Sequence, residues 1–170
     1  MHRFPMLKIA VAALLPIVAA CGDDPASPAT SFSATLSGAN EVPAVTTTAT
    51  GSATLTVSGA QITYTVNVTN LQNAVVAHIH IAPTGENGPV RLNLCGTGDP
   101  QPACTSGTGV LATGTNGTTV GTPAITFDSL LSAMRTGGAY VNVHTNLAGC
   151  TAGAPGCNPG GEIRGQVVAN

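Results

Sequence analysis

The chain has 170 residues, of which five are basic and seven acidic, so only 7% of it is charged. An average soluble domain is roughly 25% charged. Five basic residues cannot neutralise many phosphates, which excludes a nucleic-acid-binding protein. The 21 glycines and 12 prolines exclude a coiled coil or a long helical bundle, whereas 43% apolar residues are enough for a folded core. The composition therefore favours short strands joined by many turns.

The beginning of the chain has the pattern of an export signal. Arg3 and Lys8 precede an apolar run over residues 9–20 that only Pro16 interrupts. A run of this length is too short to cross a bilayer as a helix, but it is typical of the core of a signal peptide. We therefore expect residues 1–20 to be a signal peptide that is removed on export.

The apolar run ends in Val-Ala-Ala-Cys at residues 18–21, a pattern that resembles the bacterial lipobox. The resemblance implies that Cys21 is acylated and that its acyl chains hold the protein at a membrane of the cell envelope. Gly22 follows the cysteine, which by analogy with enteric sorting rules favours the outer membrane over the inner one. The protein would then face the periplasm or the cell exterior. The alternative is an ordinary secretory peptide that leaves Cys21 as a free thiol.

The remaining chain divides into a tether and one domain. Residues 21–31 are rich in Pro, Ala and Asp and predict a short lipid-anchored tether. Residues 32–170 have a size that suits a single core. Lysine is absent after residue 20, so a polybasic lipid-binding surface is excluded.

Four cysteines lie in the predicted domain, and an even number in an exported chain suggests disulfides. Three pairings are possible. The local one, Cys95–Cys104 with Cys150–Cys157, closes two short loops that are rich in Gly and Pro, and we favour it. A zinc site is the alternative, although the spacing lacks a Cys-x-x-Cys motif.

Alternation of apolar and polar residues, which is typical of half-buried strands, dominates the domain. It predicts strands over residues 31–38, 51–59, 61–70, 74–81, 90–94, 109–112, 120–127, 139–145 and 162–168. One short helix is expected after Asp128 as its N-cap, with Gly137 as its stop. Strands of this number, separated by turns, predict an all-β fold, an antiparallel β-sandwich with one short helix.

Three of the predicted strands carry titratable groups on one face only. His78 and His80 are two residues apart, so their side chains share a face of their strand. The strands near the end of the chain present a further set in the same way: Tyr140, Asn142 and His144, then Glu162 and Arg164. We expect these faces to meet inside a shell of two sheets, where imidazoles, a carboxylate and a guanidinium would converge.

Two interpretations of this convergence are open. Three neutral imidazoles suit copper or zinc, so His78, His80 and His144 are the candidate metal ligands. The alternative is a structural polar network in which Glu162 pairs with Arg164 or with an imidazole and fixes the sheet register. Imidazoles clustered around an open position favour the metal. Imidazoles that are each satisfied by a different neighbour favour the network.

Several blocks of the sequence, in order along the chain, resemble the chordin-type, or CHRD, domain. They are LSGANEVPAV (36–45), AHIH (77–80), AYVNVHT (139–145) and NPGGEIRGQV (158–167). The resemblance spans about residues 32–168 and implies an immunoglobulin-like β-sandwich. Chordins are extracellular proteins that bind growth factors, and the microbial members are exported. This chain departs from the usual pattern in its two cysteine-bearing insertions.

The order of AHIH, VNVHT and NPGGEIRGQV is also similar to that of copper-zinc superoxide dismutase, another β-sandwich. That similarity implies that His78, His80 and His144 are copper ligands. The bridging histidine and the zinc-binding loop of that enzyme have no counterpart, because His144 is the only histidine after His80.

Two functions therefore remain open from the sequence. The favoured one is an exported, membrane-anchored CHRD lipoprotein that acts as a non-enzymatic binding or structural module of the bacterial cell envelope. The other is a copper- or zinc-binding protein of the superoxide-dismutase type. The sequence assigns no catalytic residue, and it identifies no protein or small-molecule partner besides the membrane lipid.

Overall fold

A computed structural model describes residues 28–97, 100–146 and 150–170 of the chain. The predicted signal peptide, Cys21 with its predicted acylation, and most of the predicted tether lie outside these residues. None of the described helices is long and apolar enough to cross a membrane.

The described residues form nine strands, a single turn of 3-10 helix and one α-helix. In chain order these are β1 (Ser31–Ser37), η1 (Gly38–Asn40), β2 (Thr50–Ser58), β3 (Gln61–Leu71), β4 (Ala74–Ile81), β5 (Val90–Cys95), β6 (Gly107–Asn116), α1 (Phe127–Arg135), β7 (Ala139–Thr145), β8 (Ile163–Gln166) and β9 (Val168–Ala169). Their sequences carry the period-two pattern from which most of the strands were predicted.

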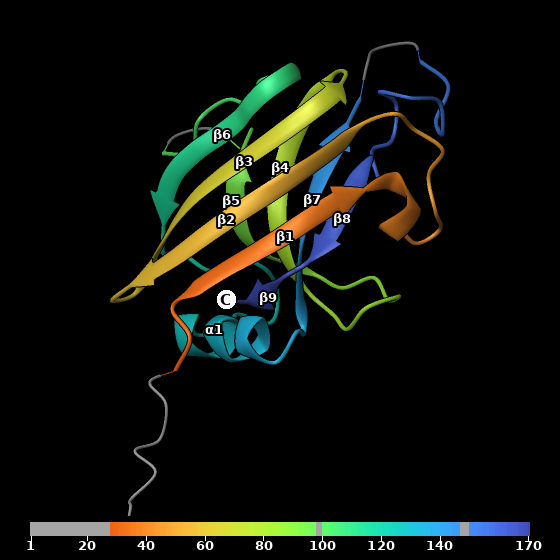
Figure 1. The fold of residues 1–170 in the computed structure, drawn as a ribbon. Helices are drawn as coiled ribbons and strands as arrows, with labels where there is room; N and C mark the ends of the chain where they lie inside the picture. Colours follow the sequence, from red (N-terminus) through yellow and green to blue (C-terminus); the bar gives the residue numbers. More distant parts are fainter. Residues whose placement is uncertain (1–27, 98–99, 147–149) are drawn as a thin grey trace, which may run out of the picture.

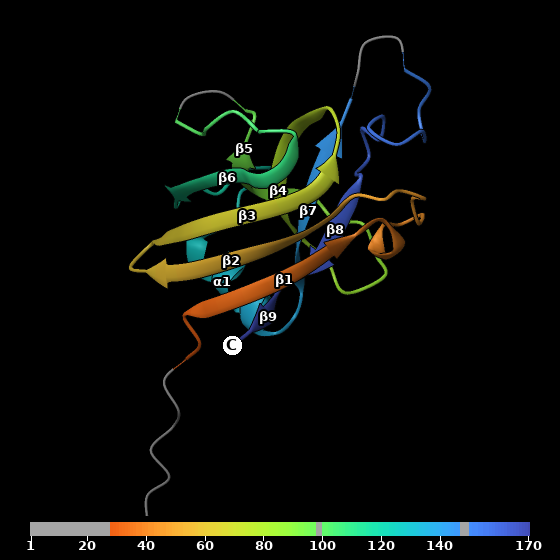
Figure 2. The same cartoon turned by 45° about the horizontal axis from the view of Figure 1, so that its top comes forward.

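The strands form one antiparallel sheet in the order β5-β4-β7-β8-β1-β2-β3-β6, and β9 also pairs with β1. The sheet turns back on itself between β8 and β1, so that β1, β2, β3 and β6 lie across β5, β4, β7 and β8 as two layers (Figure 1). Figure 2 shows the same two layers from a second direction. The prediction of an all-β sandwich with one short helix is confirmed.

The apolar core lies between the two layers. Leu55 and Val66 contribute to it from one layer, and Ile79 and Val141 from the other, each of them fully buried. Helix α1 closes one end of the sandwich and packs against β7 and β9 (Figure 1). Leu130, like its helical neighbours on the same apolar side, is buried there.

Two local predictions around this helix are wrong. Residues 120–127 are not a strand, because Gly121 adopts a φ of 100° and Pro123 has no N–H to donate to a sheet. The N-cap of α1 is Thr126, whose Oγ1 accepts a hydrogen bond of 3.1 Å from the Ser129 N–H. Asp128 lies instead in the first turn, where its charge still favours the helix dipole.

The local disulfide pairing is confirmed. Cys95 is bonded to Cys104 and Cys150 to Cys157. The first bond ties the end of β5 to the segment that leads into β6, and the second closes a loop of the connection between β7 and β8. The alternative of a zinc site built from these cysteines is thereby wrong.

Three connections cover the outer face of the β4–β7–β8 layer. The β4–β5 connection is held by the Gly88 N–H, which donates to the Tyr140 hydroxyl at 3.1 Å. The connection that leads into β8 is held by the Asn158 N–H, which donates to Thr145 Oγ1 at 2.9 Å. The segment after η1 is held by Asn87, whose side chain donates to the Val42 carbonyl. These connections bury the polar face that the sequence analysis singled out.

The turn of the sheet depends on a close approach of backbones at Gly165. A methyl group on Gly165 would fall on the Thr35 carbonyl and the Leu36 nitrogen of β1. We therefore expect Gly165→Ala to lower the free energy of unfolding by about 1–3 kcal/mol, as over-packing does in a close-packed region. Urea denaturation checks this value. Gly160→Ala is the matched control, because nothing lies within 4 Å of the added methyl, and equal losses in both variants would contradict the prediction.

Candidate metal centre

The strand register brings the predicted polar side chains to one face of the β4–β7–β8 layer. The cross-strand pairs are His78 with Asn142, His80 with Tyr140, His144 with Val76, and Asn142 with Arg164. The expectation that they meet inside the shell of two sheets is wrong. The interior is filled by the alternate residues of the same strands, such as Ala77 and Val143, and the polar groups lie on the outer face beneath the covering loops.

The three histidines form a compact cluster. One potential ligand nitrogen of each of His78, His80 and His144 lies within 4.8 Å of those of the other two. Zinc–nitrogen bonds of about 2.0–2.1 Å in a tetrahedral site place ligand nitrogens roughly 3.3 Å apart. Small rotations of the rings would therefore bring the three nitrogens to coordinating distance around one ion.

Backbone carbonyls fix the tautomer of two of these imidazoles. His80 Nδ1 lies 2.9 Å from the Gly88 oxygen, and His144 Nδ1 lies 2.9 Å from the Pro159 oxygen. A carbonyl oxygen only accepts hydrogen bonds, so each Nδ1 carries the hydrogen and each Nε2 keeps a lone pair. This arrangement is typical of metal-bound histidines, whose second nitrogen donates to a carbonyl or carboxylate.

One nitrogen of each imidazole is buried and has no hydrogen-bond partner within the described part of the chain. They are His78 Nδ1, His80 Nε2 and His144 Nε2. Buried polar atoms are nearly always hydrogen-bonded, and each exception requires an explanation. Three such exceptions, one on each imidazole of a cluster whose potential ligand nitrogens lie within 4.8 Å of one another, are consistent with a site for a shared electron-pair acceptor.

Burial keeps the cluster neutral. Desolvation, together with the smaller effects of the neighbouring imidazoles of His144 and His80, lowers the pKa of His78 to about 4. Desolvation also lowers the pKa of His80 to about 4, although its hydrogen bond to the Gly88 carbonyl acts in the opposite direction. The pKa of His144 is lowered for the same main reason. Neutral imidazole is the form that binds metal ions, so the cluster needs no deprotonation at neutral pH.

An aromatic stack supports the cluster from β7. The Tyr140 ring lies 4.8 Å from the His80 ring at an interplanar angle of 11°, and the Arg164 guanidinium carbon lies 4.5 Å from the Tyr140 ring centroid. The Gly88 peptide donates to the Tyr140 hydroxyl and accepts from His80. Tyr140 and Gly88 together therefore hold the ring of His80 in place.

The network interpretation expected Glu162 to pair with Arg164 or with an imidazole. In the structure Glu162 instead stabilises the covering loop. Its carboxylate is only 1% exposed, and it accepts hydrogen bonds from Thr145 Oγ1, the Gly156 N–H and the Asn158 side chain. Since Pro159 follows Asn158 in the same loop, Glu162 indirectly positions the carbonyl that orients His144.

Glu41 is a buried acid whose burial the sequence analysis missed. The residue is only 6% exposed, and within the described residues its Oε1 has no hydrogen-bond partner. Desolvation raises the pKa of this carboxyl to about 7, although the positive charge of Arg164 acts to lower it. The burial of Glu41 depends on loops distant in sequence, so no local signal reveals it.

The raised pKa of Glu41 makes the stability of the fold pH-dependent. The folded state holds the Glu41 proton more tightly than the unfolded state does. Protonated Glu41 therefore makes its full contribution to the free energy of unfolding below pH 4.5, and this contribution is lost as the pH rises through 7. We expect Glu41→Gln to be more stable than the wild type by about 2 kcal/mol at pH 8, and equally stable near pH 4.5. Denaturant unfolding at several pH values checks this difference. The histidines affect the stability of both proteins equally, so they cancel from the comparison.

The exposed Glu86 gives the matched control, because Glu86→Gln removes a carboxylate of the neighbouring loop without changing a buried group. We expect it to leave the pH dependence unchanged. A wild type that is more stable than Glu41→Gln at pH 8 would show that Glu41 is ionised and paired in the folded state.

One family model covers the residues that form this site. The model of the CHRD domain matches residues 32–167, a span that includes the three histidines, Arg164 and both disulfides. In comparisons with curated proteins and with solved structures, nothing matches the chain. The match covers most of the chain and the whole of the sandwich apart from its last strand. The chain therefore belongs to the CHRD domain family.

Proposed function

We propose that this CHRD domain binds a copper or zinc ion through His78, His80 and His144, and that an acylated Cys21 holds it at the bacterial cell envelope. The observation that carries the metal proposal is the cluster of three imidazoles, each with a potential ligand nitrogen within 4.8 Å of those of the other two. Each ring also has one buried nitrogen with no hydrogen-bond partner among the described residues. Membership of the family supports a non-enzymatic binding or structural module. The metal ion held by the histidine cluster would be the ligand of this module.

The cluster is better explained by a metal than by a structural network. A network would give each imidazole its own partners, as the Gly88 and Pro159 carbonyls do for one nitrogen of His80 and one of His144. The lone pairs on His80 Nε2 and His144 Nε2 have no donor among the described residues, nor does His78 Nδ1 have a partner there, and each buried polar atom left unsatisfied costs about 1–3 kcal/mol. A cation that accepts all three lone pairs removes this cost.

Three neutral nitrogens suit both copper and zinc, and the donor set alone does not choose between them. The chain offers no second metal site of the superoxide-dismutase type, because no further histidine follows His80 except His144. The proposal is therefore metal binding by the module, and it assigns no redox reaction to the site.

Metal titration of the untagged protein tests the site. We expect about one copper or zinc ion per chain, and we expect His78→Ala, His80→Ala and His144→Ala each to weaken binding at least about tenfold, because each removes one of three ligands. Elemental analysis after dialysis gives the stoichiometry, and the nitrogen hyperfine pattern of bound Cu²⁺ reports the number of imidazole ligands.

Thr63→Val on the exposed face of β3 is the control for the metal experiment, and we expect it to bind metal like the wild type. The proposal would be overturned if the wild type bound less than one metal ion per chain and folded His78→Ala protein bound the same amount. Circular dichroism of each variant establishes that it is folded before the comparison is made.

The anchor is proposed from the sequence at residues 18–21 and is tested separately. We expect an alkyne-labelled fatty acid fed to the expressing bacteria to be incorporated into the wild type but not into Cys21→Ser. The wild type should sediment with membranes, and Cys21→Ser should be soluble. Thr30→Ala in the tether is the control and should behave like the wild type. Labelling that persists in Cys21→Ser would refute acylation at this residue.

A further inference from the structure

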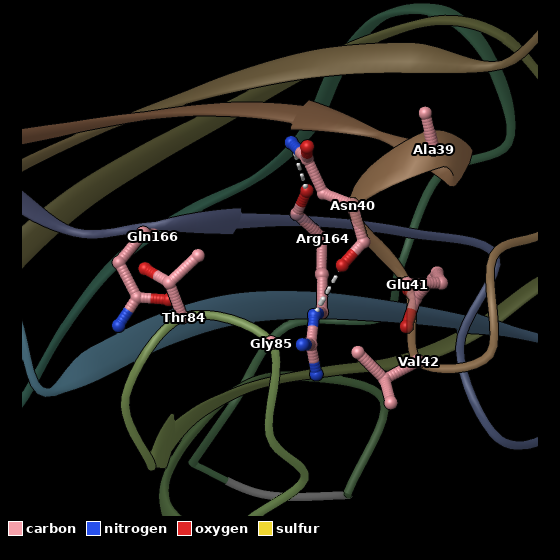
Figure 3. A pocket seen from close by; sticks show the side chains of 8 residues that line it. All are labelled: Ala39, Asn40, Glu41, Val42, Thr84, Gly85, Arg164 and Gln166. Atoms are coloured by element: carbon pink, nitrogen blue, oxygen red, sulfur yellow. Dashed lines mark hydrogen bonds between the residues drawn. The ribbon is translucent and has the colours of Figure 1, made fainter.

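A second polar pocket lies beside the histidine cluster and shares none of its ligand residues. It has a volume of about 280 Å³ and opens between the segment after η1 and the β4–β5 connection. Its walls are Ala39, Asn40, Glu41, Val42, Thr84, Gly85, Arg164 and Gln166. Figure 3 shows the Arg164 side chain extending into the middle of this group.

Neutral acceptors occupy three of the five donors of the Arg164 guanidinium. Nε donates to the Asn40 carbonyl at 2.7 Å, and Nη1 donates to the Glu86 carbonyl at 3.1 Å and to Asn87 Oδ1 at 2.9 Å. These bonds, together with the Tyr140 ring, fix the plane of the guanidinium. The two hydrogens on Nη2 have no acceptor among the described residues, so they are available to a ligand.

The positive charge of Arg164 has no anionic hydrogen-bond partner in the described part of the chain. The residue is only 3% exposed, and buried charges are ordinarily paired. Glu162, the acid nearest to it in sequence, is engaged by Thr145, Gly156 and Asn158. Glu41 lines the pocket, but desolvation raises its pKa to about 7, so it is largely uncharged in mildly acidic solution.

We propose that this pocket binds a small monocarboxylate anion, which pairs with the Arg164 guanidinium through Nη2. One fixed positive charge matches one negative charge, and the pocket walls contain no second cation that would favour a dianion such as phosphate. The Thr84 hydroxyl and the protonated form of Glu41 are the wall groups that can donate to the second carboxylate oxygen. The small side chains of Ala39 and Val42 leave room for a short apolar group.

This inference does not depend on the proposed metal, because none of the three histidines lines the pocket. Its test uses chelator-treated, metal-free protein near pH 6, so failure of one proposal leaves the other standing. Titration with propionate is expected to give saturable chemical-shift changes at the amides of Thr84 and Gly85 and at Arg164 Nε–H. Chloride and phosphate at equal ionic strength should give much smaller changes.

Two variants test the pocket. Arg164→Gln removes the charge, and we expect propionate to bind about tenfold or more weakly, since a charge-assisted hydrogen bond is lost. Arg164 also holds three carbonyl or amide groups of the covering loops, so this variant could unfold. Val42→Phe keeps Arg164 and adds bulk beside the guanidinium, where Figure 3 shows the Val42 side chain, and it should abolish binding.

Ala44→Leu is the matched control, because Ala44 is exposed on the same segment but does not line the pocket. It should bind propionate like the wild type. Binding that is unchanged in Val42→Phe would overturn the proposal. Equal chemical-shift changes with chloride and with propionate would also overturn the proposal, because the pocket would then not distinguish a carboxylate from a simple anion.

Discussion

Burial of β7 on both faces is the constraint from which the candidate site follows. Every residue of this strand is buried, so its alternation does not separate core from solvent. One face joins the apolar interior, and the other, with Tyr140, Asn142 and His144, must be covered by something that satisfies polar groups. The covering loops do this with backbone carbonyls, those of Gly88 and Pro159, which engage one nitrogen of an imidazole and leave the other as an acceptor.

Tyr140 links the two polar regions of this face. Its ring contacts His80 of β4 on one flanking strand and Arg164 of β8 on the other. The charge of Arg164 reaches His80, where it contributes to the lowered pKa. The same repulsion would act on a cation bound by the imidazoles, so an anion beside Arg164 would lower the electrostatic potential at the proposed metal ligands. Binding in one region would then change the affinity of the other through charge, without movement of the strands.

The sequence predicts the strands well because their signal is local. The spans 74–81 and 139–145 match β4 and β7 at both ends, and apolar and polar residues alternate over 77–81 and 139–144. The same pattern shows that His78 and His80 share a face. It does not show which side of the layer that face is on, because strands buried on both sides present two enclosed faces.

The remaining features depend on contacts between distant segments. Glu41 becomes buried only when the segment after η1 meets the β4–β5 connection, and the orienting carbonyls carry no side-chain signature. Segment 120–127 contains β-branched and aromatic residues that favour a strand, but Gly121 and Pro123 prevent regular pairing. Long-range loop packing, and not strand propensity, therefore sets the chemistry of the site.

The Cys150–Cys157 bond lies in the loop that supplies the carbonyl for His144. Cys157 precedes Asn158 and Pro159 directly, so the covalent closure limits how far this part of the loop moves from β7. Ring orientation at His144 is thereby tied to thiol oxidation, a step that takes place in oxidising compartments such as the bacterial periplasm. Chain made under reducing conditions would carry the same three imidazoles with one of them less firmly oriented, and its affinity for a cation would be correspondingly lower.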